Sequence, residues 1–290
     1  MRKILLFAFI VIFAIISRFL FIGKMPPLID ASLIFSRYVS AVLSVGSILL
    51  CYILIKHSFK RIKLALLSAF LMAVLPWTIE QGRIFSQVNN ALFFCLLIIF
   101  FLEKINRRFY KIVLLLLIPA GLYFIYPQFW LFRLSQKMPN LADLLNNIFV
   151  LFSPDMLFFH NITFWWGGIK EFGIIYLSLS PFFLYGFYRL INSGRYKLFF
   201  LLVFILLISS LSPFFPESRE FFFSVPILSF ATAYGIIDSF DRNKKRKLVK
   251  LLIVFSLIFF FYEISQYFHY YTVHYGQEII KNQSQIYEAF

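Results

Sequence analysis

Asp30 is a candidate for acid–base chemistry because of its position in this chain. It follows a short run from Lys24 through Pro26 and Pro27, and a long apolar stretch begins directly after it. A carboxylate at such a position can act as a general base on a hydroxyl or amide group, or help to hold a divalent metal ion. It can equally cap the helix that follows, since Asp is favoured at helix N-termini. Both interpretations stay open from the residues alone.

Two arginines, Arg83 and Arg219, lie near the ends of other apolar stretches. Arg83 follows Glu80, and Arg219 follows Glu217. A guanidinium group offers a planar fork of donors that suits phosphate oxygens, and it keeps its charge next to lipid. The two side chains can therefore clamp a lipid-linked phosphate. They can instead reach toward lipid headgroups, or pair with Glu80 and Glu217.

Asp155 and His160 form a second group of polar side chains, only five residues apart. A carboxylate and an imidazole can bind a metal ion or a substrate, but two ligands are too few to specify a metal, so a structural loop role is favoured. Arg37 is the most unusual charge, because it lies about five residues inside an apolar stretch. A charge at that depth should face protein, and Asp30 is close enough in sequence to be its partner.

The composition indicates a chain that uses lipid as its solvent. Hydrophobic residues make up 61%, aromatic residues 21%, and the mean hydropathy is +0.83. A membrane span needs about 20 apolar residues, and these stretches meet or approach that length: 4–22, 32–55, 62–79, 86–102, 112–131, 171–190, 196–213, 221–238 and 249–267. We therefore expect an all-α, polytopic membrane protein of nine spans, with residues 1–290 forming one transmembrane domain. Pro119, Pro181 and Pro226 lie within these spans and are expected to kink them.

The basic residues alternate between the segments that connect the spans. With the N-terminus in the cytoplasm, most of the 28 Lys and Arg fall on inner segments, including the dense run from Arg242 to Lys250. The positive-inside rule then predicts an N-in, C-out topology, with Asp30, Arg83 and Arg219 on the outer side. Basic loops that face anionic lipid account for the net charge of +15, so we expect no nucleic-acid partner.

Two outer segments are longer than the rest, namely the loop 132–170 and the polar, Tyr-rich tail 268–290. Within the loop, apolar residues recur with helical spacing over 140–152, which predicts an amphipathic helix lying in the outer interface. Asn140 is the expected N-cap of that helix, with Asp143 three residues on. The two cysteines, Cys51 and Cys95, lie inside apolar spans, which argues against a disulfide framework. No P-loop, dinucleotide fingerprint or HExxH motif occurs, so cytosolic nucleotide hydrolysis is not expected.

Four segments share their pattern with a known family of membrane enzymes. They are Arg18 through Pro27 to Asp30; Arg37 and Ser40 through Pro76, Glu80, Arg83 and Asn89; Ser153 to His160 with Gly173 and Pro181 to Gly186; and Pro213 to Arg219 leading to Pro226, with Tyr267 to Tyr275. On these segments the chain resembles the polyprenyl-phosphate-sugar-dependent glycosyltransferases of the C-type membrane fold. The branch concerned is that of the protein O-mannosyltransferases and aminoarabinose transferases.

The resemblance implies that a sugar moves from a polyprenyl-phosphate carrier to a glycan, lipid or protein acceptor on the outer membrane face. It implies that Asp30 is the catalytic base and that Arg219 meets the lipid phosphate. Arg83 stays a second candidate for the phosphate because of its residue type and position. A divalent metal ion stays open as a cofactor, and the expected location is a prokaryotic cytoplasmic membrane. Further candidates for the substrate cavity are Arg37, Glu80, Asp155, His160 and Glu217.

The chain departs from the family pattern in three ways, so it resembles a shortened, divergent member. Ala31 stands where the family has Glu after the Asp, the first outer loop is short, and usual members have more than nine spans. Two other function classes stay open. One is a catalytically inactive lipid-binding or scaffolding relative, which Ala31 favours. The other is a lipid or solute transporter, which would carry charges in mid-span, where only Arg18 and Arg37 come close.

Overall fold

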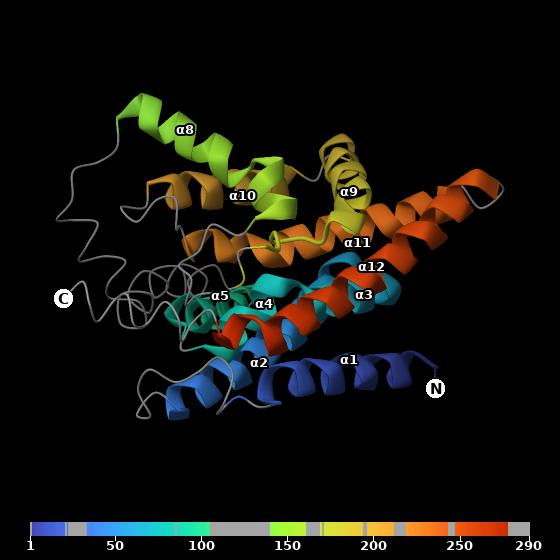
Figure 1. The fold of residues 1–290 in the computed structure, drawn as a ribbon. Helices are drawn as coiled ribbons and strands as arrows, with labels where there is room; N and C mark the ends of the chain where they lie inside the picture. The colour runs from blue at the N-terminus through green and yellow to red at the C-terminus, as the bar shows by residue number, and fades with distance from the viewer. Residues whose placement is uncertain are drawn as a thin grey trace.

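The computed structural model describes residues 2–20, 22, 34–84, 86–104, 140–160, 169, 171–193, 196–211, 219–242 and 247–277. Within these ranges the chain is helical and contains no strand (Figure 1). The helices are α1 (Arg2–Phe19), α2 (Ile34–Phe59), α3 (Ile62–Val74), α4 (Pro76–Arg83), α5 (Gln87–Lys104), α8 (Leu141–Leu151), α9 (Ser180–Asn192), α10 (Tyr196–Ser210), α11 (Val225–Arg242) and α12 (Lys247–Val273). A π-helical turn η2 (Asp155–Phe159) and the 3-10 turns η3 (Leu177–Leu179) and η4 (Arg219–Ser224) connect some of them.

Several of these helices are long and apolar enough to cross a membrane. By length and composition, five helical segments of the described chain qualify: Ile34–Phe59, Gln87–Lys104, Leu141–Phe159, Phe221–Arg242 and Lys247–Gln277. The pair α3 and α4 makes a sixth if the two helices count as one bent span. α1 is also 18 residues long and apolar, but it carries three basic residues. The prediction of an all-helical fold with apolar helices that could cross a membrane is thus confirmed for the described residues. Nine spans and their orientation stay a prediction, and the predicted span 112–131 lies outside the described residues.

Two predicted spans are interrupted in the structure. The stretch 62–79 breaks between Val74 and Pro76, where the axis bends by 60°. Leu75 is extended there (φ −59°, ψ 137°), because a residue before proline is disfavoured in the α region and Pro76 begins a new helix. The stretch 171–190 becomes helical only from Leu177 onward.

The expected proline kinks are absent from α9 and α11. Pro181 is the second residue of α9, and Pro226 is the second residue of α11. Proline in the first turn removes a backbone donor that has no helical partner in any case, so these prolines start helices instead of bending them. Pro119 lies outside the described residues.

Residues 173–179, which lead into α9, are mostly buried, and several of their backbone N–H groups bond to other parts of the protein. Ile175 N–H donates to Leu157 O at 2.8 Å. The Glu263 carboxylate of α12 accepts from Leu177 N–H at 2.9 Å and from Ser178 N–H at 3.0 Å. The Tyr176 hydroxyl donates to Val74 O at 3.1 Å. Non-helical backbone at membrane depth needs such partners, since lipid offers none.

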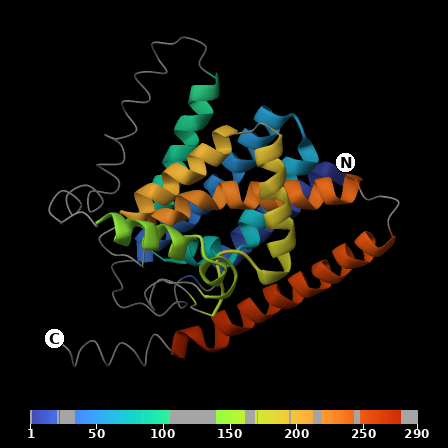
Figure 2. The ribbon, with the colours of Figure 1, turned by 90° about the horizontal axis from the view of Figure 1, so that it is seen from above.

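Small residues allow a close crossing of two helices, α9 and α11. α9 crosses α11 where Gly186 and Gly235 meet (Figures 1 and 2). A Cβ atom on Gly186 would lie 1.9 Å from Ala231 O, and one on Gly235 would lie 1.9 Å from Phe182 O. Close approach through small residues is typical of helix packing in membranes. α12 instead lies along the outside of the bundle and is mostly exposed (Figure 2).

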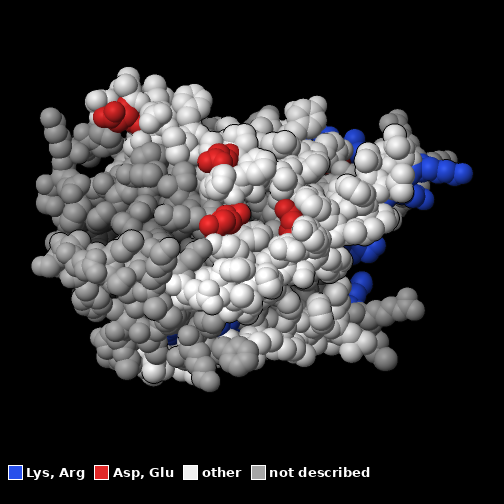
Figure 3. All heavy atoms as spheres, in the orientation of Figure 1, with Lys and Arg blue, Asp and Glu red and all other residues white. Residues whose placement is uncertain are grey.

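Exposed Lys and Arg side chains of the described helices collect at one end of the bundle. On the face seen in Figure 3, Lys and Arg gather toward the end where α1 begins. We call it the basic end: α1 and α3 begin there with Lys3 and Lys63, and α2 and α5 finish there with Lys56 and Lys104. The alternation predicted from the sequence therefore corresponds to a real segregation of charge in the described helices.

Candidate functional site

Arg18 is fully buried at the end of α1 opposite to the basic end. Its Nε donates to Ser44 Oγ at 2.8 Å, which ties α1 to α2. Its Nη1 donates to Ser17 Oγ at 2.8 Å and to Ala73 O at 3.1 Å. Its Nη2 donates to Thr78 Oγ1 at 3.3 Å, next to the break between α3 and α4. Because all three nitrogens bind protein groups, Arg18 joins four helices at this end, namely α1, α2, α3 and α4.

Arg83, the last residue of α4, binds the end of α1. Its Nη1 donates to Ser17 O at 2.8 Å and its Nη2 to Leu20 O at 2.7 Å. These carbonyls belong to the last turn of α1 and the residue after it, where carbonyl groups lack helical partners. The Nε atom donates to the Tyr271 hydroxyl at 3.1 Å, and the guanidinium lies 4.9 Å from the Tyr271 ring centroid. Arg83 thus caps α1 and also holds α12 against the bundle.

Arg37 and Glu80 lie buried in the same region. Arg37 donates from Nη1 to Ile22 O at 3.5 Å, and its electrostatic neighbours include Arg83 and Tyr271. Glu80 accepts from Ile169 N–H at 3.1 Å and is also an electrostatic neighbour of Tyr271. The structure therefore brings together three predicted candidates that lie 46 residues apart at most in sequence. We call this group, together with Arg18 and Tyr271, the arginine cluster.

The described residues on either side of the segment that contains Asp30 lie at the arginine cluster. Residues 23–33 lie outside the described residues, so Asp30 itself is not placed. On one side, the carbonyls of Leu20 and Ile22 accept from Arg83 and Arg37. On the other side, α2 starts at Ile34, one helical turn before Arg37.

Arg219 begins the turn η4, although its side chain lies outside the described part of the chain. The turn packs on α4 through aromatic contacts. The ring centroid of Trp77 lies 6.3 Å from that of Phe221 and 5.4 Å from that of Phe222. Trp77 is three residues before Glu80, so η4 lies against the helix that supplies two members of the cluster. Glu217 lies outside the described residues.

The Trp77 indole adds a buried polar group beside η4. The side chain is 1% exposed, and its Nε1 has no hydrogen-bond partner within the described residues. A buried donor of this kind is uncommon and normally meets a water molecule or a ligand. Next to the arginine cluster, the Trp77 indole N–H is therefore a buried donor to which no described protein group bonds.

Asp155 and His160 form a local pair in the π-helical turn. The His160 Nδ1 atom lies 2.7 Å from Asp155 Oδ1, and both side chains are largely exposed. His160 N–H also donates to Asp155 O, which closes the turn. No group of three or more potential metal ligands occurs in the described ranges, so this pair stands without a third ligand there. The pair closes its own turn, which agrees with the structural role in a loop that the sequence favoured.

The helix predicted over 140–152 is present as α8. The Asn140 side chain accepts from Asp143 N–H at 2.8 Å, which confirms the expected N-cap. Asn147, on the buried face, donates to Ser210 O and joins α8 to α10. α8 continues into η2, and together they are long and apolar enough to cross a membrane.

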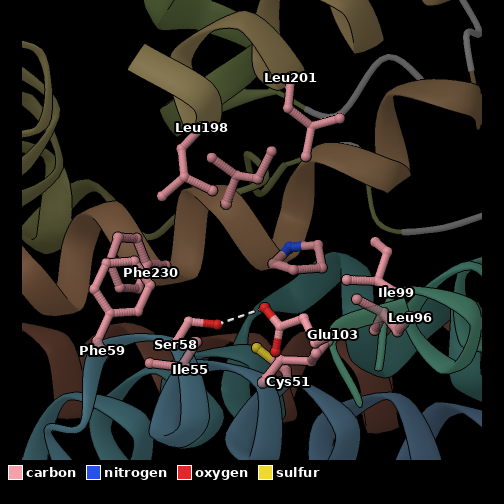
Figure 4. A pocket seen from close by; sticks show the side chains of 13 residues that line it. Cys51, Ile55, Ser58, Phe59, Leu96, Ile99, Glu103, Leu198, Leu201 and Phe230 are labelled. Atoms are coloured by element: carbon pink, nitrogen blue, oxygen red, sulfur yellow. Dashed lines mark hydrogen bonds between the residues drawn. The ribbon is translucent and has the colours of Figure 1, made fainter. Parts of the chain in front are cut away.

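A narrow crevice of about 170 Å³ opens between α2, α5, α10 and α11 toward the basic end (Figure 4). Apolar side chains such as Leu96, Leu198 and Phe230 line it. At its edge, Ser58 Oγ donates to Glu103 Oε1 at 2.7 Å, and His57 Nδ1 lies 3.3 Å from the other carboxylate oxygen. Glu103 is thus engaged by its neighbours, and the crevice lies far along α2 from the arginine cluster.

Sequence reasoning missed two polar positions that hold this region together. Glu263 was not singled out, although a single carboxylate within the strongly apolar stretch of α12 is a usable signal. Ser40 was noted only as part of a resemblance. Its carbonyl accepts from Asn89 Nδ2 at 2.8 Å, and its hydroxyl accepts from Ser86 N–H, which joins α2 to α5.

Comparison with known proteins gave no match: no family model, no curated protein and no solved structure matches this chain. What supports a function is thus the chemistry of the chain's own residues, above all those of the arginine cluster and of the segments that meet there.

Proposed function

We propose that this chain is an integral membrane glycosyltransferase, which moves a sugar from a polyprenyl-phosphate carrier to an acceptor on the outer membrane face. Asp30 is the general base, and Arg219 holds the donor phosphate. The observation that carries the proposal is the meeting of distant segments at one end of the bundle. The flanks of the Asp30 segment bind Arg83 and Arg37, and the turn that begins with Arg219 packs on the helix of Arg83.

A lipid-linked donor suits this architecture. A polyprenyl tail is as apolar as the lipid and stays in the bilayer, while its phosphate reaches the end of the bundle. There the buried guanidinium groups of Arg18, Arg37 and Arg83 contribute a positive field in a region of low dielectric, which favours an anion nearby. All three side-chain nitrogens of Arg83 donate hydrogen bonds to α1 or to Tyr271. In this proposal Arg83 therefore positions the surrounding helices, while Arg219 contacts the phosphate.

The proposed step is a displacement at the anomeric carbon of the sugar. The Asp30 carboxylate takes the proton of an acceptor hydroxyl as that oxygen forms a bond to the anomeric carbon. The bond between this carbon and the phosphate oxygen breaks, and polyprenyl phosphate leaves with the electron pair. Arg219 stabilises the extra negative charge on the leaving phosphate by charge-assisted hydrogen bonds. A positioned base contributes about 10²- to 10⁴-fold to such a reaction.

The topology that goes with this function has nine spans, with the basic end in the cytoplasm and the arginine cluster at the outer face of a prokaryotic cytoplasmic membrane. The segregation of Lys and Arg in the described helices supports this orientation. One of these nine spans, 112–131, lies outside the described residues.

Binding of the donor lipid tests the role of Arg219. Arg219→Ala should weaken the binding of a polyprenyl monophosphate in detergent micelles by about tenfold to hundredfold, because the phosphate loses a charged donor. The same variant should bind the uncharged polyprenol as the parent protein does. Thermophoresis of the labelled protein measures both affinities.

Arg61→Ala is the matched control, since Arg61 is exposed in the turn between α2 and α3 at the basic end. It should leave both affinities unchanged. Equal affinities of the Arg219→Ala variant and the parent protein for the phosphate would remove Arg219 from the proposed site. Phosphate binding that depends on Arg219, in a protein that transfers no sugar, would favour the inactive lipid-binding relative.

A further inference from the structure

A groove between α1 and α3 lies at the basic end, away from the arginine cluster. Its volume is about 410 Å³. Leu6 and Phe9 line it from α1, and Leu67 and Phe70 line it from α3. Leu6 and Phe9 are about half exposed, at 48% and 55%. Such an apolar groove on the outside of a membrane protein is shaped to take a hydrocarbon chain.

Two lysines, Lys3 and Lys63, stand at the basic end of this groove and help to line it. Each is the second residue of its helix, and neither helix has an acidic residue in its first turn. A cation is disfavoured there, because the N-terminus of a helix carries a partial positive charge. Arg61, the N-cap of α3, makes no side-chain capping hydrogen bond. Two ammonium groups and two helix N-termini thus converge without a carboxylate in either first turn.

We propose that this groove binds an anionic phospholipid from the leaflet at the basic end. One acyl chain lies along Leu6, Phe9, Leu67 and Phe70, and the phosphate lies between Lys3 and Lys63. An anionic headgroup offsets the unfavourable charge of both helix N-termini, whereas a zwitterionic headgroup brings its own cation. Charge complementarity therefore selects the headgroup, and the apolar walls select a lipid over a soluble phosphate. The site is independent of sugar transfer.

Fluorescence quenching by brominated lipid tests the proposal on the full chain. Phe70→Trp places an indole in the groove, and the parent protein supplies the background of the native tryptophans. In phosphatidylcholine nanodiscs, phosphatidylglycerol with brominated chains should quench this indole at lower mole fraction than brominated phosphatidylcholine does. Lys3→Gln and Lys63→Gln should each reduce this preference roughly fivefold.

The matched control is the double change Lys247→Gln and Lys250→Gln. Both lysines are exposed at the start of α12 and do not line the groove. The control should keep the preference for phosphatidylglycerol. Circular dichroism and gel filtration of each variant should match those of the Phe70→Trp protein.

Four results would overturn the proposal. Equal quenching by the two brominated lipids would show that the groove does not select an anionic headgroup. If the control and the Lys3 and Lys63 variants lost equal shares of the preference for phosphatidylglycerol, that preference would come from the overall surface charge and not from this groove. Displacement of phosphatidylglycerol by soluble glycerol 3-phosphate would indicate a phosphate site instead of a lipid site. A dimer in which neither lipid quenches the indole would assign the groove to a second copy of the chain.

Discussion

Arg83 shows how a single side chain can organise the proposed site without touching the substrate. It caps the end of α1, and in doing so fixes the point from which the Asp30 segment departs. It also binds Tyr271 through both the hydroxyl and the ring. A charge this deeply buried is retained only where it has such partners. We therefore expect the replacement of Arg83 to lower the stability of the fold before it affects any chemistry.

Replacing Arg83 by Ala should lower the free energy of unfolding by about 3 kcal/mol, because buried carbonyls lose their charged donor and α12 loses an anchor. The measurement is equilibrium unfolding in mixed micelles, without added polyprenyl lipid. Arg242→Ala is the control, since Arg242 is largely exposed and pairs with Asp238 at i,i+4. That change should cost less than about 1 kcal/mol. Similar losses in the two variants would contradict the capping role of Arg83.

Glycine matters most where α9 crosses α11. A methyl group on Gly186 would meet Ala231 O at 1.9 Å, and that atom is backbone, so the helices themselves must separate. Overpacking of this kind typically costs 1–3 kcal/mol, and we expect Gly186→Ala to lower the unfolding free energy by about 3 kcal/mol.

Gly46→Ala is the matched control for that substitution. The atoms nearest to its new methyl group belong to the ring of Phe93, a side chain that can turn away, and not to backbone. Thermal unfolding of the two variants should show the larger drop for Gly186→Ala. Equal unfolding temperatures for the two variants would contradict the tight packing of α9 against α11.

At the scale of helices, hydropathy and charge predicted most of the long elements to within a few residues. α1, α2, α5 and α11 match the expected stretches, and the capped helix α8 was found from its periodicity. The failures share one cause, since a hydropathy window does not register a break in the backbone. Leu75 and Pro76 divide an apolar stretch. The segment before Leu177 is irregular, and its Ile175 N–H bonds to Leu157 O instead of to a helical partner.

The candidate site was predictable only in part. Arg37, Glu80 and Arg83 were selected from the sequence as charges near apolar stretches, and the structure places them together. Their partners were not predictable, because a contact such as that of Arg83 with Tyr271 joins residues 188 positions apart. Both Arg18 and Arg83 donate to backbone carbonyls. Such partners cannot be predicted from the sequence, because every residue type carries a backbone carbonyl.

At the scale of the whole molecule, the proposed orientation places the tail outside and the basic end inside. In a variant without Cys51 and Cys95, a cysteine at Gln285 should react with an impermeant maleimide added to intact cells. A cysteine at Lys247, at the start of α12, should react only after permeabilisation. The reverse pattern would place the arginine cluster in the cytoplasm and would contradict the outer-face site.

Sugar transfer by the purified protein tests the central claim most directly. The assay supplies radiolabelled polyprenyl-phosphate hexoses and pentoses with membrane acceptors, and compares the parent protein with Asp30→Asn and Asp143→Asn. Asp30→Asn keeps the size and capping ability of the side chain but removes the base, so transfer should fall by about 10²- to 10⁴-fold. Asp143→Asn, at an exposed residue of α8, should transfer at the parent rate. Undiminished transfer by Asp30→Asn, or no transfer by the parent protein from any of these donors, would contradict the proposed enzyme.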